Sequence, residues 1–396
     1  MLIWLLACTP TPDHPGPDAL PGPTRLSTGG ERADVVAYGT GALISWVEDE
    51  GERRVAYLAH LGSDGAIGAP VTLPAEDPVA GLARKPQLAS DGHRVLAVWS
   101  TGGPRGSTVV LAEADAPEGP YTTRLLATGD PSAAVTLVDQ PDVHLAPDGE
   151  AWVGFKAEVD HPFVELRFAR ERTGWVPTPF LPAEGTPCEC CPHSLRWLPS
   201  GDAWLVLRGN DHNLREIHEA QLQVTAPPVP GGDLTVVRGT QVSHTGWFVQ
   251  GCPFDGPDAE AIDEERRVVA WVDPTAGPSR AWIAASVDGG AHWSRARPVL
   301  ADDARIDQHP AFTALSDGTL VLAVDDYWSG TALLAGPPEA WLPDTDAPLI
   351  EHPDVERLPL SRPLWDVSLA PFAGGVIAVG NDEDGALWAE PLRISE

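Results

Sequence analysis

The run Ala42-Leu43-Ile44-Ser45-Trp46 is a short apolar segment that follows a glycine-containing turn, and its pattern recurs six more times along the chain. The later copies end at Trp99, Phe155, Leu207, Trp271, Val324 and Val379, with successive spacings of 53, 56, 52, 64, 53 and 55 residues. Every copy except the first has a proline 13 to 16 residues upstream: Pro86, Pro141, Pro192, Pro257, Pro310 and Pro363. A repeat of this length holds about four strands with short turns, which is the content of one propeller blade. The sequence therefore predicts an all-β fold, a seven-bladed β-propeller, with a six-bladed ring containing one irregular unit as the competing count.

The seventh repeat is one strand short, because the chain ends soon after residues 385–389. The segment Thr24-Arg25-Leu26-Ser27 resembles the stretches at 70–73 and 123–126, where outer strands of other blades are expected. We expect this N-terminal strand to complete the seventh blade and close the ring, which removes an exposed sheet edge.

The composition agrees with strands and turns rather than long helices, since the chain has 39 Gly and 41 Pro beside 15 Trp. Its formal net charge is −31, and Lys85 and Lys156 are its only lysines. Such a charge repels polyanions and disfavours self-association, so we expect no nucleic-acid partner and a monomer. The uninterrupted repeats predict one propeller domain over residues 25–396.

The N-terminus reads MLIWLLAC over residues 1–8, an apolar run whose end resembles a bacterial lipobox. The resemblance implies a lipoprotein signal segment over residues 1–8, with Cys8 as the residue that carries the lipid. Residues 9–24 are rich in proline and are expected to form an extended tether. The expected location is the bacterial cell envelope, at the outer membrane or cell surface, with the membrane bound through a lipid anchor at Cys8. The alternative is a fortuitous apolar start with an ordinary cysteine.

The segment 286–293, SVDGGAHW, resembles the Asp box of sialidase-like propellers, Ser-x-Asp-x-Gly-x-x-Trp. Its matching residues are Ser286, Asp288, Gly290 and Trp293. In that family the box lies at the periphery of a blade and stabilises a turn, so the resemblance indicates fold rather than activity.

A second resemblance is carried by Cys188-Glu189-Cys190-Cys191-Pro192, followed by Arg208, Arg215 and Gly251-Cys252-Pro253. This order resembles a group of bacterial sialidase-like repeat proteins, mostly of unassigned function. The match covers residues 186–300, and only the blade pattern extends beyond it. Gly209 stands where the pattern has an acidic residue.

The loop that leads into the first strand of a blade and the loop between its second and third strands lie on one face of a propeller. Those leading into first strands carry Arg84, Lys85, Asp139, Asp142, the cysteine cluster with His193, Asp258, Asp307, His309, Arg362 and Asp366. Those between second and third strands add His161, Asp211, His212, Arg215, Asp325, Asp326 and Tyr327. We therefore expect a candidate site at the mouth of the central channel.

The four cysteines other than Cys8 allow three interpretations. Disulfides are the ordinary expectation in an oxidising compartment, and a bridge from the cluster Cys188, Cys190 and Cys191 to Cys252 would join neighbouring blades. The thiolates could instead bind copper or zinc, with His193 as a further ligand. Reactive thiols are the third interpretation, because adjacent cysteines cannot all pair locally without strain.

Three functions remain open at this point. The favoured one is a binding module that presents its loop face to a glycan, a protein or a metal ion. An exo-sialidase or related glycoside hydrolase is the alternative: Arg84, Arg208, Arg215 and Arg362 would hold a substrate carboxylate, with Tyr327 and Asp326 in the reaction. Against it, the chain lacks the N-terminal Arg-Ile-Pro type motif of true sialidases and has only four tyrosines. A metal-binding or redox lipoprotein centred on the cysteine cluster is the third.

Overall fold

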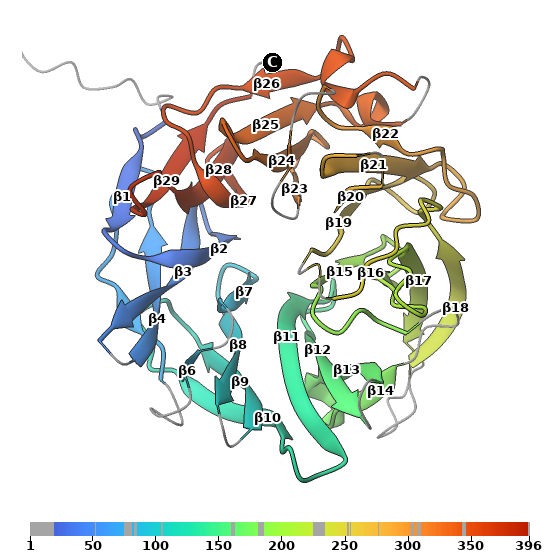
Figure 1. Ribbon diagram of the computed structural model, residues 1–396. Coiled ribbons are helices and arrows are strands. Elements are labelled where there is room, and N and C mark those ends of the chain that lie inside the picture. Colours follow the sequence, from blue (N-terminus) through green and yellow to red (C-terminus); the bar gives the residue numbers. More distant parts are fainter. Residues whose placement is uncertain are drawn as a thin grey trace, which may run out of the picture.

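A computed structural model describes residues 20–394 apart from residues 52, 75–80, 83–84, 104–105, 160–162, 181–185, 225–233, 252, 254, 276, 302–304, 307–309 and 343–345. Seven antiparallel sheets stand around a central axis like the blades of a propeller (Figure 1). This confirms the predicted seven-bladed fold and excludes the six-bladed count.

The blades follow one another along the chain. Blade one holds β2 (Glu31–Tyr38), β3 (Gly41–Glu50), β4 (Arg53–Leu61) and β5 (Val71–Thr72). Blade two holds β6 (Gly81–Leu82), β7 (Gln87–Ser90), β8 (Val95–Gly103), β9 (Gly106–Ala114) and β10 (Thr122–Gly129). Blade three holds β11 (Val135–Leu145), β12 (Ala151–Val159), β13 (Val164–Arg170) and β14 (Thr178–Phe180). Blade four holds β15 (His193–Trp197), β16 (Ala203–Arg208), β17 (Ile217–Val224) and β18 (Leu234–Gln241).

The remaining blades complete the ring. Blade five holds β19 (Asp258–Ala261), β20 (Arg267–Asp273), β21 (Arg280–Ser286) and β22 (Arg297–Pro298). Blade six holds β23 (Ala311–Ala314), β24 (Leu320–Asp326), β25 (Gly330–Gly336) and β26 (Glu356–Leu358). Blade seven holds β27 (Trp365–Phe372), β28 (Gly375–Asn381), β29 (Leu387–Leu392) and β1 (Thr24–Ser27). Three short 3₁₀ turns lie in the connections, η1 (Glu171–Thr173), η2 (Pro338–Trp341) and η3 (Leu349–Glu351). Among the described residues no helix is long and apolar enough to cross a membrane.

The repeated apolar run is the second strand of each blade, and both of its faces are buried. In β20, Val268, Ala270 and Val272 pack against blade six, whereas Val269 and Trp271 pack against blade four. Alternate residues of a strand point to opposite faces, so a strand that lies between two neighbouring blades is apolar at every position. This packing explains why the sequence shows continuous apolar runs rather than alternation.

The ring is closed by the strand expected from the sequence. β1 pairs with β29 in antiparallel register, with Thr24 opposite Ala389, Arg25 opposite Trp388 and Ser27 opposite Leu387. The first strand of the chain thus forms the outer edge of the blade whose other three strands come from the last thirty residues or so. The predicted closure is confirmed.

The Asp-box turn joins β21 to β22 at the outside of blade five. Ser286 Oγ accepts the Gly290 N–H at 2.7 Å, and Asp288 accepts the His292 N–H at 2.9 Å. A Cβ atom on Gly290 would lie 2.6 Å from Glu219 of blade four, which is why a glycine is needed there. Trp293 stacks on Trp204 of blade four with ring centroids 6.3 Å apart. The turn therefore holds two blades together.

Deleting residues 1–28 should weaken the fold because it removes β1 and exposes the edge of β29. Three register pairs are lost, and at roughly 1 kcal/mol for each hydrogen bond the free energy of unfolding should fall by about 2–4 kcal/mol. Urea unfolding followed by tryptophan fluorescence measures this. A deletion of residues 1–19 keeps β1 and is the matched control. An equal unfolding midpoint for both deletions would show that the closure carries no stability.

Candidate functional site

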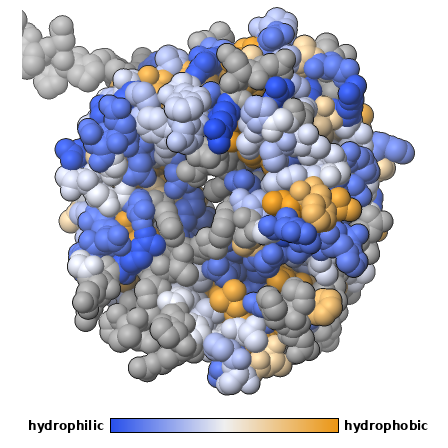
Figure 2. All heavy atoms as spheres, viewed as in Figure 1, coloured by the Kyte–Doolittle hydropathy of each residue, from blue (hydrophilic) through white to orange (hydrophobic). Residues whose placement is uncertain are grey.

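The innermost strands of all seven blades surround a cavity on the propeller axis. Its volume is about 370 Å³, within the range of small-molecule sites. Its walls come from β2, β7, β11, β15, β19, β23 and β27. Figure 2, viewed from the same side as Figure 1, shows that the surface of the molecule is hollowed near its centre. Of the residues predicted at the channel mouth, Lys85, Asp142, His193 and Asp258 do line this cavity.

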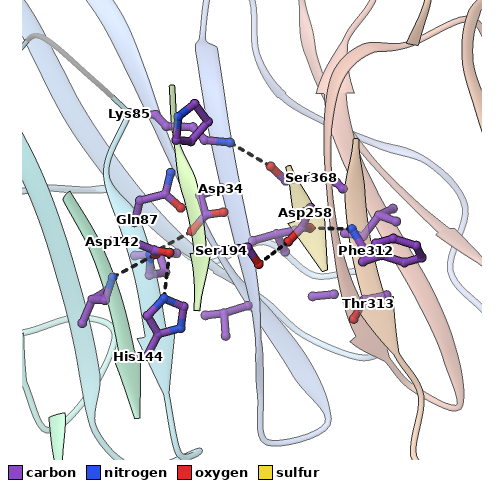
Figure 3. Close-up of a pocket in the computed structure, with 18 of the residues that line it drawn as sticks. Asp34, Lys85, Gln87, Asp142, His144, Ser194, Asp258, Phe312, Thr313 and Ser368 are labelled. Atoms are coloured by element: carbon purple, nitrogen blue, oxygen red, sulfur yellow. Dashed lines mark hydrogen bonds and ion pairs between the residues drawn. The ribbon is translucent and has the colours of Figure 1, made fainter. Parts of the chain in front are cut away.

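Polar side chains of the innermost strands tie several blades to the next. Asp34 Oδ2 accepts the Leu88 N–H of blade two at 2.8 Å, and Asp258 Oδ2 accepts the Phe312 N–H of blade six at 2.7 Å. Ser368 Oγ donates to the Ala33 carbonyl at 3.0 Å, which joins blade seven to blade one. Figure 3 shows these carboxylates arranged around one space. The cavity wall is therefore held in place by bonds that run between blades.

The two permanent cations of the wall are already engaged. Arg196 contacts Asp258 at 2.8 Å and Glu260 at 3.4 Å. Burial alone would lower the pKa of Arg196, but these carboxylates outweigh it and raise the pKa. Lys85 Nζ donates to the Ala33 carbonyl at 3.0 Å and to Ser368 Oγ at 3.1 Å. Arg196 is therefore paired with carboxylates within the wall, whereas the partners of Lys85 are neutral, and its charge acts on Asp34, where it lowers the pKa.

Two carboxyl groups of the cavity have pKa values that are driven apart. Burial raises the pKa of Asp34 to about 6, an effect that Lys85 reduces and the charge of Asp142 reinforces. Burial also acts on Asp142, but its interactions with neighbouring basic groups, first of all His144, whose Nε2 lies 2.7 Å from Asp142 Oδ2, outweigh burial and lower the pKa of Asp142 to about 2. At neutral pH Asp142 is ionised, and Asp34 titrates just below neutrality.

His193 is a buried polar group without a hydrogen-bond partner among the described residues. The residue is 6% exposed, lines the cavity, and neither ring nitrogen has a hydrogen-bond partner among the described residues. Burial lowers the pKa of His193 to about 3 although Asp142 opposes it, so the imidazole is neutral at physiological pH. A neutral imidazole has one donor and one acceptor nitrogen. Both ring nitrogens are inaccessible to solvent, and a Cβ atom on Gly154 of blade three would lie 2.7 Å from Nε2, so the ring faces the neighbouring blade.

The cysteine cluster forms a small loop directly before β15. Cys188 and Cys191 are joined by a disulfide, and the Cys190 sulfur lies 3.9 Å from that of Cys188. The buried Lys156 donates to the carbonyls of Cys188 and Cys191, which binds the loop to blade three.

Two predictions concern this loop, a copper or zinc site and a disulfide to Cys252. The three sulfurs lie within 4.8 Å of one another, but two sulfurs joined as a disulfide offer no thiolate to copper or zinc. A metal site here is therefore incompatible with the oxidised loop. The expected bridge to Cys252 involves a residue that lies outside the described part of the chain, as does Cys8.

Gln140 links the cysteine loop to the cavity. It sits in a β-bulge of β11 with φ 54°, a conformation that costs a residue other than glycine some strain. Its Nε2 donates to the Cys190 carbonyl at 2.8 Å, and its side chain lines the cavity. Bulges and positive φ angles of this kind concentrate at functional sites.

The arginines proposed as carboxylate ligands lie elsewhere. Arg208 is fully buried and donates to the main-chain carbonyls of Asp255, Arg215 and Val272. Arg215 is 1% exposed and contacts Glu189 at 3.2 Å. Both hold the loops over blades four and five rather than facing the cavity.

The other residues of that proposal are likewise spread out. Arg362 lies over the Trp388 ring, 3.4 Å from its centroid, in blade seven. Asp326 accepts the Trp328 N–H at 2.8 Å and so caps its own turn, while Tyr327 is 46% exposed at the rim. Arg84 lies outside the described residues. None of these described side chains lines the cavity.

Exposed aromatic residues mark the face on which the cavity opens. Phe163, Phe248 and Trp328 are 62%, 55% and 74% exposed, and all belong to loops of that face. Phe248 pairs with Leu214 in an isolated bridge. Figure 2 shows a hydrophobic patch beside the central hollow. Such residues around an opening are typical of a binding surface.

Sequence reasoning missed Asp34, His144 and Arg196. The available signal is alternation within an innermost strand, because residues two apart share a face. Three such pairs follow the repeated prolines: Asp142 with His144, Ser194 with Arg196, and Asp258 with Glu260. Asp34 carries no such mark, since its blade has no proline at this position.

Comparison with known proteins gives the fold alone. No family model matches the sequence, and no curated protein matches it. An α-L-arabinofuranosidase from Fusarium graminearum aligns with a TM-score of 0.52 at 11% identity, covering 95% of this chain and 99% of that one. A protein of unknown function from Dyadobacter fermentans gives 0.51 at 11% identity, over 95% and 100% of the two chains. The β-propeller domain of the Trilobed protease from Pyrococcus furiosus gives 0.51 at 9% identity, over 94% and 97%. This chain is similar to all three in its propeller architecture.

Proposed function

We propose that this protein is a cell-envelope lipoprotein whose propeller is a binding module, with an axial cavity that takes a small polar ligand such as a sugar unit of a glycan. The observation that carries the proposal is the axial cavity of about 370 Å³, whose lining includes the polar side chains of Asp34, Gln87 and Asp142 from different blades. Small-molecule sites are typically cavities of this size with a few polar groups that orient the ligand. A ligand hydroxyl, which both donates and accepts, matches carboxylate and amide groups.

A ligand that carries a carboxylate, as sialic acid does, fits this cavity poorly. Arg196 is paired with Asp258 and Glu260, and Lys85 is bonded to blades one and seven. The lining holds the carboxyl groups of Asp34, Asp142 and Asp258 against the two cations Lys85 and Arg196, so a further carboxylate would be repelled. These contacts favour a neutral or positively charged ligand over an acidic one.

The lipid anchor is supported by the sequence around Cys8 and by the proline-rich stretch at 9–24. Both lead into β1, which begins at Thr24 on the outer edge of blade seven.

Replacing the lipidated thiol should release the protein from the membrane. In a bacterial host the wild type should incorporate labelled palmitate and sediment with membranes, whereas Cys8→Ser should do neither, because a serine hydroxyl does not replace the thiol in lipoprotein processing. Fractionation and autoradiography measure both properties. Cys190→Ser is the control, and equal labelling of Cys8→Ser and wild type would contradict the anchor.

Filling the cavity should abolish ligand binding. A panel of monosaccharides is screened by the shift in melting temperature, and a sugar present at about 100 times its Kd should raise it by about 3–6 °C. Gln87→Trp places an indole in the cavity at a side chain that lines it and should remove the shift. Thr122→Trp, on the exposed outer strand of blade two, is the control. A shift that survives Gln87→Trp would move the site away from the axis.

Glycoside hydrolysis is a second candidate function. It is favoured by Asp34 and Asp142, two cavity carboxyl groups with pKa values of about 6 and about 2. Glycosidases use one carboxylic acid as proton donor and one carboxylate as base or nucleophile, and groups driven apart in pKa suit these roles. The fold resemblance to an arabinofuranosidase adds nothing here, because fold does not transfer chemistry.

Fluorogenic glycosides test this second candidate. The sialoside should be hydrolysed no faster than in buffer, and Arg362→Ala should change nothing. If a neutral glycoside is hydrolysed, Asp34→Asn and Asp142→Asn should each lower kcat by about 10²–10⁴-fold, because each removes one proton-transfer group. Asp346→Asn, at a carboxylate that is 79% exposed, is the control. Buffer-level rates for every glycoside would exclude hydrolysis.

A further inference from the structure

Three histidines of the described chain lie 2.7 Å from an aspartate carboxylate, and they differ in their surroundings. The side chains of His212 and His292 are 97% and 89% exposed. That of His144, whose partner is Asp142, is 15% exposed and lines the axial cavity. Of the three pairs, this one is therefore placed to act on a ligand.

The strand β11 turns both members of this pair toward the axis. Relative to β12 it holds one extra residue between Asp139 and Asp142, in the bulge that contains Gln140. A shift of one residue exchanges the two faces of a strand, so the bulge decides which side chains face the cavity. Beyond the bulge, Val143 packs in the core between blades two and three, while the residues on either side of it line the cavity.

Asp142 fixes the orientation and the tautomer of the His144 ring. Its Oδ1 accepts the Val143 N–H at 2.9 Å, and its Oδ2 lies 2.7 Å from His144 Nε2 (Figure 3). An ionised carboxylate can only accept hydrogen bonds, so the hydrogen of this contact belongs to Nε2. In the neutral imidazole the lone pair is then on Nδ1.

The Nδ1 atom of His144 is the ring nitrogen that remains for a ligand. It bonds no other described residue, and it is reached by solvent, in contrast to both ring nitrogens of His193. The ring is already held by Asp142, so little freedom is lost when a ligand binds to it. The axial cavity thus has a fixed acceptor that carries no charge when the imidazole is neutral.

We propose that His144 is the acceptor that selects the ligand of the axial cavity, a neutral sugar with one free hydroxyl on Nδ1, and that Asp142 is its positioning residue. This inference rests on the proposed function and names the group that recognises the ligand. A hydroxyl donates to Nδ1, whereas a fluorine atom or an ether oxygen in the same place cannot. The site should therefore reject sugars that are fluorinated or alkylated at that one position.

Isothermal titration of the full chain tests the selection. D-Glucose, D-galactose and D-mannose are titrated, and each one that binds is compared with its monodeoxyfluoro analogues. We expect replacement of one particular hydroxyl to lower the affinity about tenfold or more, because the donor to Nδ1 is lost.

The variant His144→Gln removes the same hydrogen bond from the protein side. It keeps an N–H group toward Asp142 and has no acceptor at the place of Nδ1. Affinity for the parent sugar should fall about tenfold, and the parent and the sensitive analogue should then bind equally, as a double-mutant cycle requires. His292→Gln, at a side chain that is 89% exposed, is the control and should bind as the wild type does.

Asp142→Asn tests the positioning role. An asparagine amide can donate to Nε2, which moves the ring hydrogen to Nδ1 and turns the acceptor into a donor. Affinity should fall about tenfold, and nitrogen-15 NMR of histidine-labelled protein should show the His144 hydrogen on Nδ1 instead of Nε2. Asp346→Asn should change neither. A loss of affinity without the change of tautomer would contradict the positioning role.

Diethyl pyrocarbonate provides a readout that needs neither a ligand nor a variant. It acylates imidazole nitrogens that carry a lone pair and can be reached from solvent. Peptide mass mapping should find modification at His144 and at the exposed His292 and none at His193. Modification of His292 without His144 would contradict the open nitrogen.

The two proposals fail in different ways. Sugar binding that Gln87→Trp blocks, but that neither His144→Gln nor any single fluorine weakens, would overturn this inference and leave the binding cavity standing. If no sugar binds in a way that Gln87→Trp blocks, this inference and the proposed function both fail.

Discussion

Packing between adjacent blades is the interaction on which this structure depends. The second strand of each blade lies between two neighbours and sends alternate apolar side chains to each, as β20 does with Val269 and Val272. The hydrophobic core is consequently divided into separate layers, one at each junction between blades. Because these layers supply the burial that the fold needs, the innermost strands are free to carry polar residues toward the axis.

Those polar residues serve the scaffold and the site together. Asp34 and Asp258 each accept a main-chain N–H from the following blade, and the same carboxylates face the cavity. A carboxylate that is fixed in this way is already oriented before a ligand arrives, so little entropy is lost on binding. The cost is partial burial of charge, which is visible in the raised pKa of Asp34.

The sequence was sufficient for the fold, because a fully apolar second strand recurs at each blade and the proline before an innermost strand recurs at six of them. It also predicted the closing strand and several channel residues, including Asp142 and Asp258. It did not place the arginines: Arg208 and Arg215 follow a motif on the correct face, but burial turns them toward main-chain carbonyls and Glu189. Nothing in a linear pattern distinguishes an arginine that holds a loop from one that meets a ligand. His193 was considered as a metal ligand, and its isolation became visible only with the neighbouring blades in place.

The seam between β1 and β29 has a consequence for the order of folding. β29 (Leu387–Leu392) is the last strand of the ring in chain order, whereas its partner Thr24–Ser27 is the first. Blades one to six can assemble from neighbouring segments as they emerge, but blade seven must wait until β29 has been synthesised. Until then the early strand stays unpaired, and the nascent ring remains an open arc with two uncovered ends.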